Sequence, residues 1–414
     1  MSHGPAQDKP QVIYLDNNAT TRVAPEVLEE MLPFLSDYYG NPSSMHSFGG
    51  KVGGKINQAR ERVAAALSCD PREIVFTSCG TESDNTALHS AVSARPDKRH
   101  IVTTRVEHPA VLNYVKLLEQ QGYSVTWLPV DKHGRLDLEH VREAIRADTA
   151  VVSVMWANNE SGTIFPVREI GAMCREKGVP FHTDAVQAVG KIPVNLKELP
   201  CDYLALSGHK IHAPKGIGAL YVRKGMLFKP FMIGGHQERG RRGGTENAAS
   251  IIGLGKAMEL AAAGIQDENT RVKALRDRLE KGLIGVIPEA LINGDPVNRL
   301  PNTLSIAFKY IEGEAMLLLL DQFGICASSG SACTSGSLEP SHVLRAMGVP
   351  FTYAHGSLRF SLSRYTTEAE IDTVVRELPK IVARLRAMSP FSADSETEGE
   401  HKAAAACAVE RSTE

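Results

Sequence analysis

Reactive side chains recur where short hydrophobic runs of the sequence end. Lys210 follows the run DYLAL, within the segment Ser-Gly-His-Lys at 207–210, and Asp184 ends the run VPFHTD. In an open α/β sheet, ligands bind beyond the carboxyl ends of the strands, so these side chains are expected at one site. A lysine in such a cleft is partly desolvated, which lowers its pKa and frees the amine for Schiff-base formation. We therefore predict that Lys210 anchors a pyridoxal phosphate. The alternatives are a solvated surface charge for Lys210, and Lys215 as the anchor, although a flanking proline and glycine mark Lys215 as a turn residue.

The neighbouring strand ends carry the partners that a pyridoxal ring requires. These are a carboxylate for the pyridine nitrogen, donors for the phosphate and an amide for the phenolic oxygen. Asp184 offers the carboxylate, Gln187 follows it by one short turn, and Asn159 lies in a polar cluster after the run AVVSVM. Gly80 and Thr81 begin a helical pattern after EIVFTS, where backbone N–H groups can bind a phosphate. The simpler alternatives are that Thr81 only caps a helix and that the cluster around Asn159 is only a turn.

Two further side chains fit a site for an amino-acid substrate. His108 closes another strand and precedes a helix, so it is a candidate to stack on the cofactor ring or to move a proton; capping or packing is the alternative. Arg359 lies in the apolar pattern SLRFSL, where its guanidinium requires a partner. That partner is either a bidentate substrate carboxylate or an internal salt bridge.

A second reactive centre is predicted at Cys333. This cysteine lies in the segment 327–337, whose small residues leave the backbone mobile and the thiol unshielded. Such a thiol can reach both a cleft and an outside partner. Cys326 follows a hydrophobic run and is assigned to the core. A metal pair of Cys326 and Cys333, or of His209 and His212, lacks further clustered ligands, so we predict no resident metal.

The elements that must position these residues follow from the hydrophobic pattern. Seven β-rich runs alternate with amphipathic segments between about residues 70 and 225, which predicts a mainly parallel sheet covered by helices. The runs are EIVFTS, HIVTT, SVTWLPV, AVVSVM, VPFHTD, DYLALS and IGALYV. Helices are expected at 26–39 and 51–67, and one or two long helices over 247–285.

A smaller α+β domain is expected after the long helices. Its elements are TLSIAF, a helix at 313–323, SLRFSL and a final helix at 367–387. We predict four parts of the chain and give them in order. These are an N-terminal segment at 1–20 associated with the small domain, a large cofactor-binding domain at 21–265, the small domain with the Cys333 loop at 266–388, and a disordered tail at 389–414.

The composition is that of an ordinary globular protein and excludes several functions. With 46 basic and 48 acidic residues the net charge is -2, which gives no general grip on nucleic acid or on an anionic membrane. The sequence shows no leader and no uncharged apolar run of about 18 residues. Seven cysteines without regular spacing indicate reduced thiols, so we expect a cytoplasmic protein. No full dinucleotide fingerprint is present, which argues against a nicotinamide enzyme.

Taken together, these segments resemble the cysteine desulfurases of the class V aminotransferase group, over about residues 12–388. The segments that carry the resemblance are 14–21 (YLDNNATT), 40–44 (GNPSS), 81–85 (TESDN), 106–108 (VEH), 158–160 (NNE), 182–187 (HTDAVQ), 207–210 (SGHK) and 329–333 (SGSAC). Two more, 235–242 (GHQERGRR) and 362–365 (LSRY), are similar to the nitrogen-fixation, NifS-type branch.

The resemblance implies a fold-type I pyridoxal-phosphate enzyme, a homodimer with sites near the interface, and a role for each site residue. Lys210 would carry the cofactor, His108 would stack on its ring and Asp184 would pair with the ring nitrogen. Asn159 and Gln187 would flank the phenolic oxygen, and Arg359, with Asn159 nearby, would bind the substrate. The phosphate ligands implied are Gly80, Thr81, Ser207, Gly208, His209 and, from the opposite subunit, Thr245.

The implied reaction removes sulfur from free L-cysteine, giving alanine and a persulfide on Cys333. An iron–sulfur scaffold protein would accept the sulfur, for cluster assembly that serves nitrogenase, and Cys333 would contact a cluster during transfer. The alternatives are a housekeeping desulfurase, or a selenocysteine lyase or aminotransferase of the same fold for which Cys333 is dispensable. An iron–sulfur or zinc carrier using Cys326, Cys333 and a histidine is the alternative from a different class.

Overall fold

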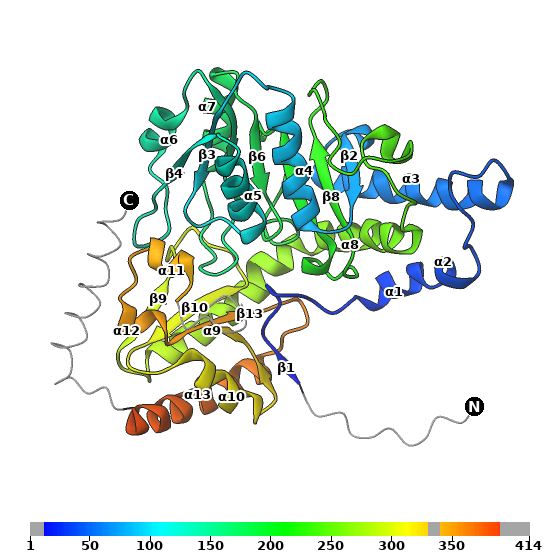
Figure 1. Cartoon of the computed structure of the whole chain (residues 1–414). Coiled ribbons are helices and arrows are strands. Elements are labelled where there is room, and N and C mark those ends of the chain that lie inside the picture. The colour runs from blue at the N-terminus through cyan, green and yellow to red at the C-terminus, as the bar shows by residue number, and fades with distance from the viewer. Residues whose placement is uncertain (1–11, 330–339, 390–414) are drawn as a thin grey trace, which may run out of the picture.

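A mainly parallel, seven-stranded sheet forms the centre of the larger part of the molecule (Figure 1). The computed structural model describes residues 12–329 and 340–389. The strand order is β2-β8-β7-β6-β5-β3-β4, and only β8 runs antiparallel to its neighbours. The strands are β2 (Ile74–Thr77), β3 (His100–Thr104), β4 (Ser124–Leu128), β5 (Thr149–Ser153), β6 (Phe181–Asp184), β7 (Tyr203–Ser207) and β8 (Gly218–Val222). All seven coincide with the predicted runs, so the predicted sheet is confirmed.

Helices cover both faces of this sheet, as parallel strands require. On one face, α4 (Gly80–Ser93) and α5 (Pro109–Gln120) bury residues such as Leu88 and Val111 against the strands. The other face packs against α3 (Ser47–Leu67), α6 (Leu138–Ala144), α7 (Val167–Glu176) and α8 (Ala248–Asp267). Because both faces are covered, the open positions of the sheet are its strand ends, where the site residues lie.

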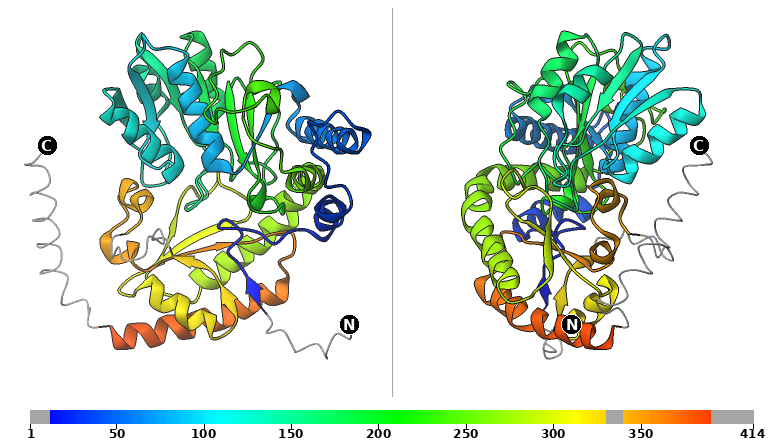
Figure 2. Two further views of the ribbon diagram at one scale, coloured as in Figure 1. Left: turned by 45° about the vertical axis from the view of Figure 1, so that its right-hand side comes forward. Right: turned by 90° about the vertical axis from the view of Figure 1, so that its left-hand side faces the viewer.

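The smaller part has its own sheet and its own hydrophobic core (Figure 2). Its four strands lie in the order β12-β13-β10-β9, and the short N-terminal strand β1 pairs in parallel with β11 beside them. The strands are β1 (Ile13–Tyr14), β9 (Ala290–Asn293), β10 (Thr303–Phe308), β11 (Ile325–Cys326), β12 (Ser328–Ser329) and β13 (Ser357–Ser361). The helices are α9 (Lys273–Ile284), α10 (Gly313–Asp321), α11 (His342–Ala346), α12 (Phe351–Ala354) and α13 (Glu368–Met388).

One continuous helical stretch connects the two cores. It runs through α8, a π-helical turn at Glu268–Val272 and α9. The stretch Ala248–Ile284 is long and apolar enough to cross a membrane by composition, but half of its most apolar window is buried inside the protein. Residues of α8 such as Leu254 belong to the core shared with α3, which is the environment of a core helix.

Two local expectations are wrong. The helix expected at 26–39 is two short helices, α1 (Pro25–Met31) and α2 (Pro33–Ser36), because Pro33 has no N–H to continue the ladder. Cys326 is only partly buried, and Ile325 fills the core in its place, because successive side chains of a strand point to opposite faces. The predicted tail at 389–414 lies outside the described residues, except for Ser389.

Candidate active site

Lys210 lies just beyond the carboxyl end of β7, where a short 3-10 turn at Gly208–Lys210 follows the strand. Its Nζ donates hydrogen bonds to the backbone carbonyls of Asn18, at 2.6 Å, and Ala19, at 2.8 Å. Burial lowers the pKa of Lys210 to about 8, and the positive charge of Arg359 acts in the same direction. The rival Lys215 is exposed to solvent. Lys210 is therefore the lysine that offers a reactive amine within the cleft.

Asp184 ends the adjacent strand β6 and is almost fully buried. Its Oδ1 accepts a hydrogen bond from the backbone N–H of Val186 at 2.9 Å. Burial raises the pKa of Asp184, whereas the nearby His108 and Lys210 lower it. A buried carboxylate of this kind is stabilised by a cationic partner, which is what a protonated ring nitrogen provides.

His108 begins α5, and its Nδ1 accepts a hydrogen bond from the backbone N–H of Ala110 at 3.1 Å. The capping interpretation is therefore correct, and it also fixes the ring beside the strand ends. Burial lowers the pKa of His108. In the neutral ring the proton is then on Nε2, because Nδ1 serves as an acceptor.

The start of α4 forms a tight cradle next to the end of β7. A Cβ atom at Gly80 would approach Val186 Cγ2 to 2.8 Å and Ser207 Cβ to 3.4 Å. The Oγ of Ser207 is buried and has no hydrogen-bond partner among the described residues. Cys79 caps the helix through its Sγ, so the interpretation of Thr81 as the cap is wrong, and the Thr81 side chain is exposed. A buried hydroxyl beside free helix N–H groups is the donor set that a phosphate requires.

His209 and Gly208 lie in the turn that directly follows Ser207. The Nδ1 of His209 lies 3.1 Å from Thr20 Oγ1, and burial lowers the pKa of His209 to about 4, so the ring is neutral at pH 7. A Cβ at Gly208 would come within 2.8 Å of Ile217 Cγ2, so the chain can turn here only without a side chain. Together these residues, with Lys210 and Asp184, fit pyridoxal phosphate.

Arg359 on β13 lies opposite these strand ends. Its Nη2 donates to Asp16 Oδ1 at 2.9 Å, and its Nη1 donates to the backbone carbonyl of Asn159 at 3.0 Å. The internal salt bridge is therefore present. The buried Nε of Arg359 has no hydrogen-bond partner among the described residues, which leaves a donor for a further acceptor.

Asn18 is the central residue of the site that sequence reasoning missed. Its backbone carbonyl accepts from Lys210 Nζ and from Gln187 Nε2, the latter at 3.0 Å. Its backbone N–H donates to Ser361 Oγ at 2.8 Å, and its Nδ2 donates to Thr303 Oγ1 at 2.9 Å. Asn18 thus joins both parts of the molecule at the site. The only signal in the sequence was the polar segment DNNATT directly after a short apolar run.

Two predicted residues are not part of this cluster. Thr245 is exposed in the loop before α8 and, within residues 12–329 and 340–389, makes no hydrogen bond to the strand ends of its own chain. Cys333 lies outside the described residues. The described part of the chain contains no group of three or more His, Cys, Asp or Glu side chains that could hold a metal ion.

Comparison with known proteins agrees with this geometry. The model of the family described as aminotransferase class-V matches residues 13–374. A cysteine desulfurase of Trichormus azollae is 63% identical over 383 residues, covering 92% of this chain and 96% of the relative. The cysteine desulfurase NifS of Azotobacter vinelandii is 61% identical, covering 92% and 94%. A solved structure described as a NifS-like protein superposes with a TM-score of 0.86 at 42% identity, covering 91% of this chain and all of the other.

Proposed function

The chain belongs to the aminotransferase class-V family and is a pyridoxal-phosphate-dependent cysteine desulfurase, and we propose that Lys210 carries the cofactor and that Cys333 receives the sulfur of L-cysteine. The observation that carries the proposal is the partly buried amine of Lys210, held by two carbonyls at the carboxyl edge of the sheet, with a pKa lowered to about 8. A neutral amine at this position is the form that reacts with an aldehyde.

The side chains around Lys210 provide the other contacts that pyridoxal phosphate requires. Asp184 would pair with the ring nitrogen, His108 would stack on the ring, and Asn159 and Gln187 would flank the phenolic oxygen. The phosphate would be held by Gly80, Thr81, Ser207, Gly208 and His209, with Thr245 supplied by a second copy of the chain. When bound, the cofactor supplies an electron-withdrawing ring that stabilises negative charge at the substrate Cα.

The protein's own groups perform the rest of the chemistry. Arg359 binds the substrate carboxylate through its remaining donors, and Lys210 moves the proton at Cα. The Cys333 thiolate attacks the substrate sulfur, so that an S–S bond forms while the C–S bond breaks. The carbon keeps the electron pair, takes up a proton and leaves as alanine, and Cys333 is left as a persulfide for an acceptor.

The test compares the wild type with Cys333→Ser and Lys210→Ala. With a thiol reductant, the wild type is expected to release alanine and sulfide in equal amounts from L-cysteine. Cys333→Ser should keep the visible absorbance of the cofactor but form no alanine, whereas Lys210→Ala should lose both activity and the borohydride-sensitive absorbance. Desulfuration of cysteine by Cys333→Ser would refute the proposal and favour the selenocysteine lyase or aminotransferase alternative.

We further propose an iron–sulfur scaffold protein as the sulfur acceptor, in service of nitrogenase, with general cluster assembly as the alternative. Support comes from the relative named NifS. Deletion of the gene in its host decides between them. Loss of nitrogenase activity with normal activity of other iron–sulfur enzymes is expected, and a general loss of iron–sulfur enzymes would favour the alternative.

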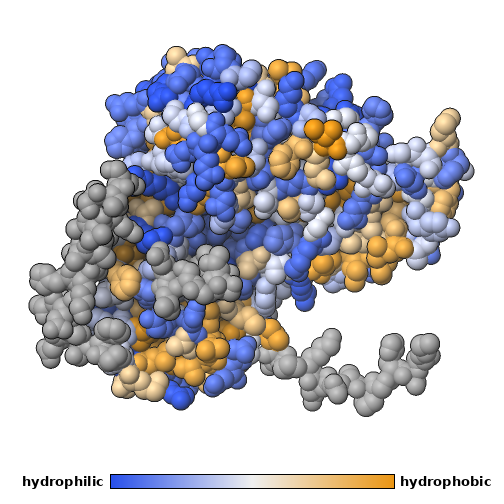
Figure 3. All heavy atoms as spheres, viewed as in Figure 1, coloured by the Kyte–Doolittle hydropathy of each residue, from blue (hydrophilic) through white to orange (hydrophobic). Residues whose placement is uncertain are grey.

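A cytoplasmic homodimer is the proposed form of the enzyme. The helices α1 and α2 expose apolar side chains on the face shown in Figure 3. These are Leu28 on α1, Leu32 between the two helices and Leu35 on α2, of which Leu35 is 64% exposed. An exposed cluster of this kind is typical of a surface that another chain covers. The relatives are bacterial proteins, and the reduced state expected for the thiols supports a cytoplasmic location.

A further inference from the structure

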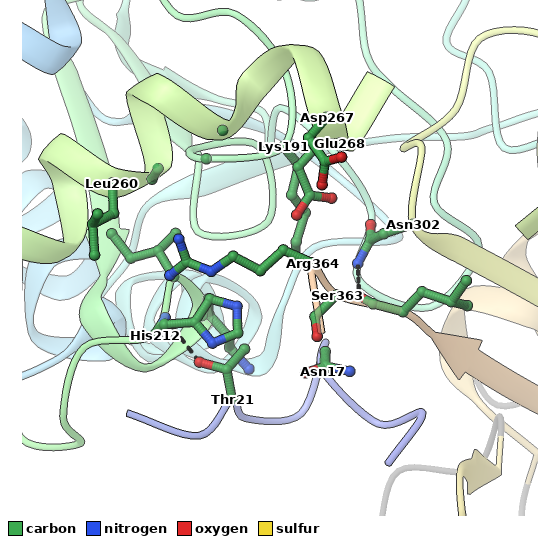
Figure 4. Close-up of a pocket in the computed structure, with 16 residues that line it drawn as sticks. Asn17, Thr21, Lys191, His212, Leu260, Asp267, Glu268, Asn302, Ser363 and Arg364 are labelled. Atoms are coloured by element: carbon green, nitrogen blue, oxygen red, sulfur yellow. Dashed lines mark hydrogen bonds between the residues drawn. The ribbon is translucent and has the colours of Figure 1, made fainter. Parts of the chain in front are cut away.

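A cavity borders Lys210 on the side of the π-helical turn, and several charged side chains line it (Figure 4). It has a volume of about 70 Å³, and the proposed reaction uses none of its other polar side chains. Lys191, Asp267 and Glu268 lie together at one end of it, as Figure 4 shows. A lysine enclosed at such a position requires an explanation, because burying an ammonium group is costly unless it is hydrogen-bonded.

Lys191 is only 6% exposed, and its ammonium group points to the active-site residues. Its Nζ donates to Gln187 Oε1 at 2.6 Å and to Asn18 Oδ1 at 3.2 Å. Burial lowers the pKa of Lys191 to about 7, with the charge of Lys210 acting in the same direction and that of Glu268 opposing it. Lys191 therefore contacts both Gln187 and Asn18. The carbonyl of Asn18 in turn accepts hydrogen bonds from Gln187 and from Lys210, the proposed anchor of the cofactor.

The backbone around Lys191 is also fixed. Asn269, in the π-helical turn, donates from Nδ2 to the Lys191 carbonyl at 2.9 Å. The preceding Gly190 has φ of +78°, and a Cβ there would lie 2.8 Å from Ile211 Cγ2. These contacts fix the backbone from which the side chain of Lys191 extends. A residue with a side chain would not easily replace Gly190 in this conformation.

The contact at 2.6 Å determines which way the amide of Gln187 is turned. In its protonated form Lys191 has only donors, so the atom that faces it is the amide oxygen of Gln187. The Nε2 group of Gln187 is then directed to the Asn18 carbonyl, which also accepts from Lys210. Among the described residues only one N–H of Gln187 is engaged in this way, which leaves the other for a further acceptor.

We propose that Lys191 is a positioning residue that acts through Gln187, so that an amide N–H and not the amide oxygen faces the phenolic oxygen of the bound cofactor. This inference rests on the role proposed above for Gln187. An N–H donor stabilises an anionic oxygen, whereas an amide oxygen in its place would repel it. Without Lys191, the amide is free to turn and the donor is lost.

The test is a pH titration of the visible absorbance of the holoenzyme in Lys191→Met. An anionic phenolic oxygen that loses its donor holds the neighbouring proton more tightly, so the titration midpoint should rise by about one pH unit. Gln187→Leu should raise the midpoint in the same way. Lys197→Met is the matched control, because Lys197 is an exposed lysine of the same region, and it should leave the midpoint unchanged.

The double variant separates a positioning role from a structural one. If Lys191 acts through Gln187, Lys191→Met in a Gln187→Leu background adds no further shift. Additive shifts of the midpoint in the double variant would overturn the proposal. So would an unchanged midpoint in Lys191→Met when the midpoint of Gln187→Leu is raised. An unchanged midpoint in both would overturn it together with the role of Gln187, while the anchoring role of Lys210 would stand.

A second variant covers the case in which Lys191→Met does not fold. Lys191→Gln keeps a polar group at this position, but it has no charge and its side chain is too short to bond both Gln187 and Asn18. It should show the same upward shift of the midpoint. A wild-type midpoint in a folded Lys191→Gln enzyme would contradict the proposal equally well.

Discussion

At the scale of single residues, the chemistry depends on amines and carboxylates that the fold removes from water. Lys210 is the clearest case, because burial and the charge of Arg359 both disfavour its ammonium form. Its pKa of about 8 means that a useful fraction of the amine is neutral near neutral pH. An ordinary lysine, with a pKa of about 10.4, would be almost fully charged there.

The first prediction concerns the pH dependence of Lys210 in the cofactor-free protein. Because only the neutral amine reacts, the rate of reductive methylation of Lys210 should rise with pH and reach half of its maximum near pH 8. Mass spectrometry of the peptide that contains Lys210 measures it. In urea the midpoint should return to about 10.4, and a native midpoint near that value would contradict the account.

Arg359 gives the second prediction. Arg359→Leu removes a charge-assisted contact to the substrate carboxylate, which is expected to lower kcat/KM for L-cysteine by about 10- to 100-fold, mainly through KM. Steady-state alanine release measures the effect. Asp16→Asn is the control, because it weakens the salt bridge but keeps the guanidinium; a loss as large as that of Arg359→Leu would mean that the salt bridge alone matters.

At the scale of elements, the loop that contains Thr245 is held to the large domain by several contacts, of which the ion pair between Glu238 and Arg60 is the most deeply buried. Both oxygens of Glu238, in the 3-10 turn η3 (Gln237–Gly240), accept from Arg60 on α3, and Oε2 also accepts from the Phe76 N–H of β2 at 2.9 Å. Glu238 has a positive φ of 48°, a strained conformation for a residue with a side chain. The ion pair with Arg60 therefore offsets the conformational free energy that the backbone of Glu238 requires.

The third prediction follows from the burial of this pair. Glu238→Ala leaves the Arg60 charge unpaired, so the free energy of unfolding should fall by about 3–5 kcal/mol. Glu198→Ala breaks the exposed pair with Arg168 and should cost less than about 1 kcal/mol. Denaturant unfolding of both variants gives the comparison, and equal costs would contradict the importance assigned to the buried pair.

The elements also show what the sequence could and could not predict. Alternation of apolar runs was sufficient for the strands of the large sheet and for the residues at their ends, since that pattern is local. The roles of Asn18 and Lys191 could not be predicted, because their contacts with Lys210 and Gln187 form only in the tertiary fold. The periodicity of a sequence does not show which carbonyl group a lysine will contact. The break at Pro33, by contrast, was readable from the proline itself.

At the scale of the whole molecule, two cores meet at the site and are joined by Asn18 and by the continuous α8–α9 stretch. The helices α1 and α2 lie to one side of this junction (Figure 1), and their segment carries exposed apolar side chains. The proposed dimer would bury them and would bring Thr245 of one chain to the phosphate of the other. Cofactor binding and association should therefore be linked.

The fourth prediction tests that linkage. Replacing Leu32 and Leu35 together by Asp should convert the protein to a species of half the mass in sedimentation, with weaker cofactor binding. Leu318→Asp alters a leucine of α10 that is more exposed than either of them, at 72%, and should leave the mass unchanged. A wild-type protein that sediments as a monomer, or a double variant that remains a dimer, would contradict the proposed interface.

The identity of the anchoring lysine is the most direct test of the whole account. Borohydride reduction of the holoenzyme makes the bond between cofactor and lysine permanent, and peptide mass spectrometry then locates the pyridoxyl group. The label is expected on Lys210, the partly buried amine just beyond the end of β7. A label on the exposed Lys215 or on Lys191, with Lys210 unmodified, would contradict it.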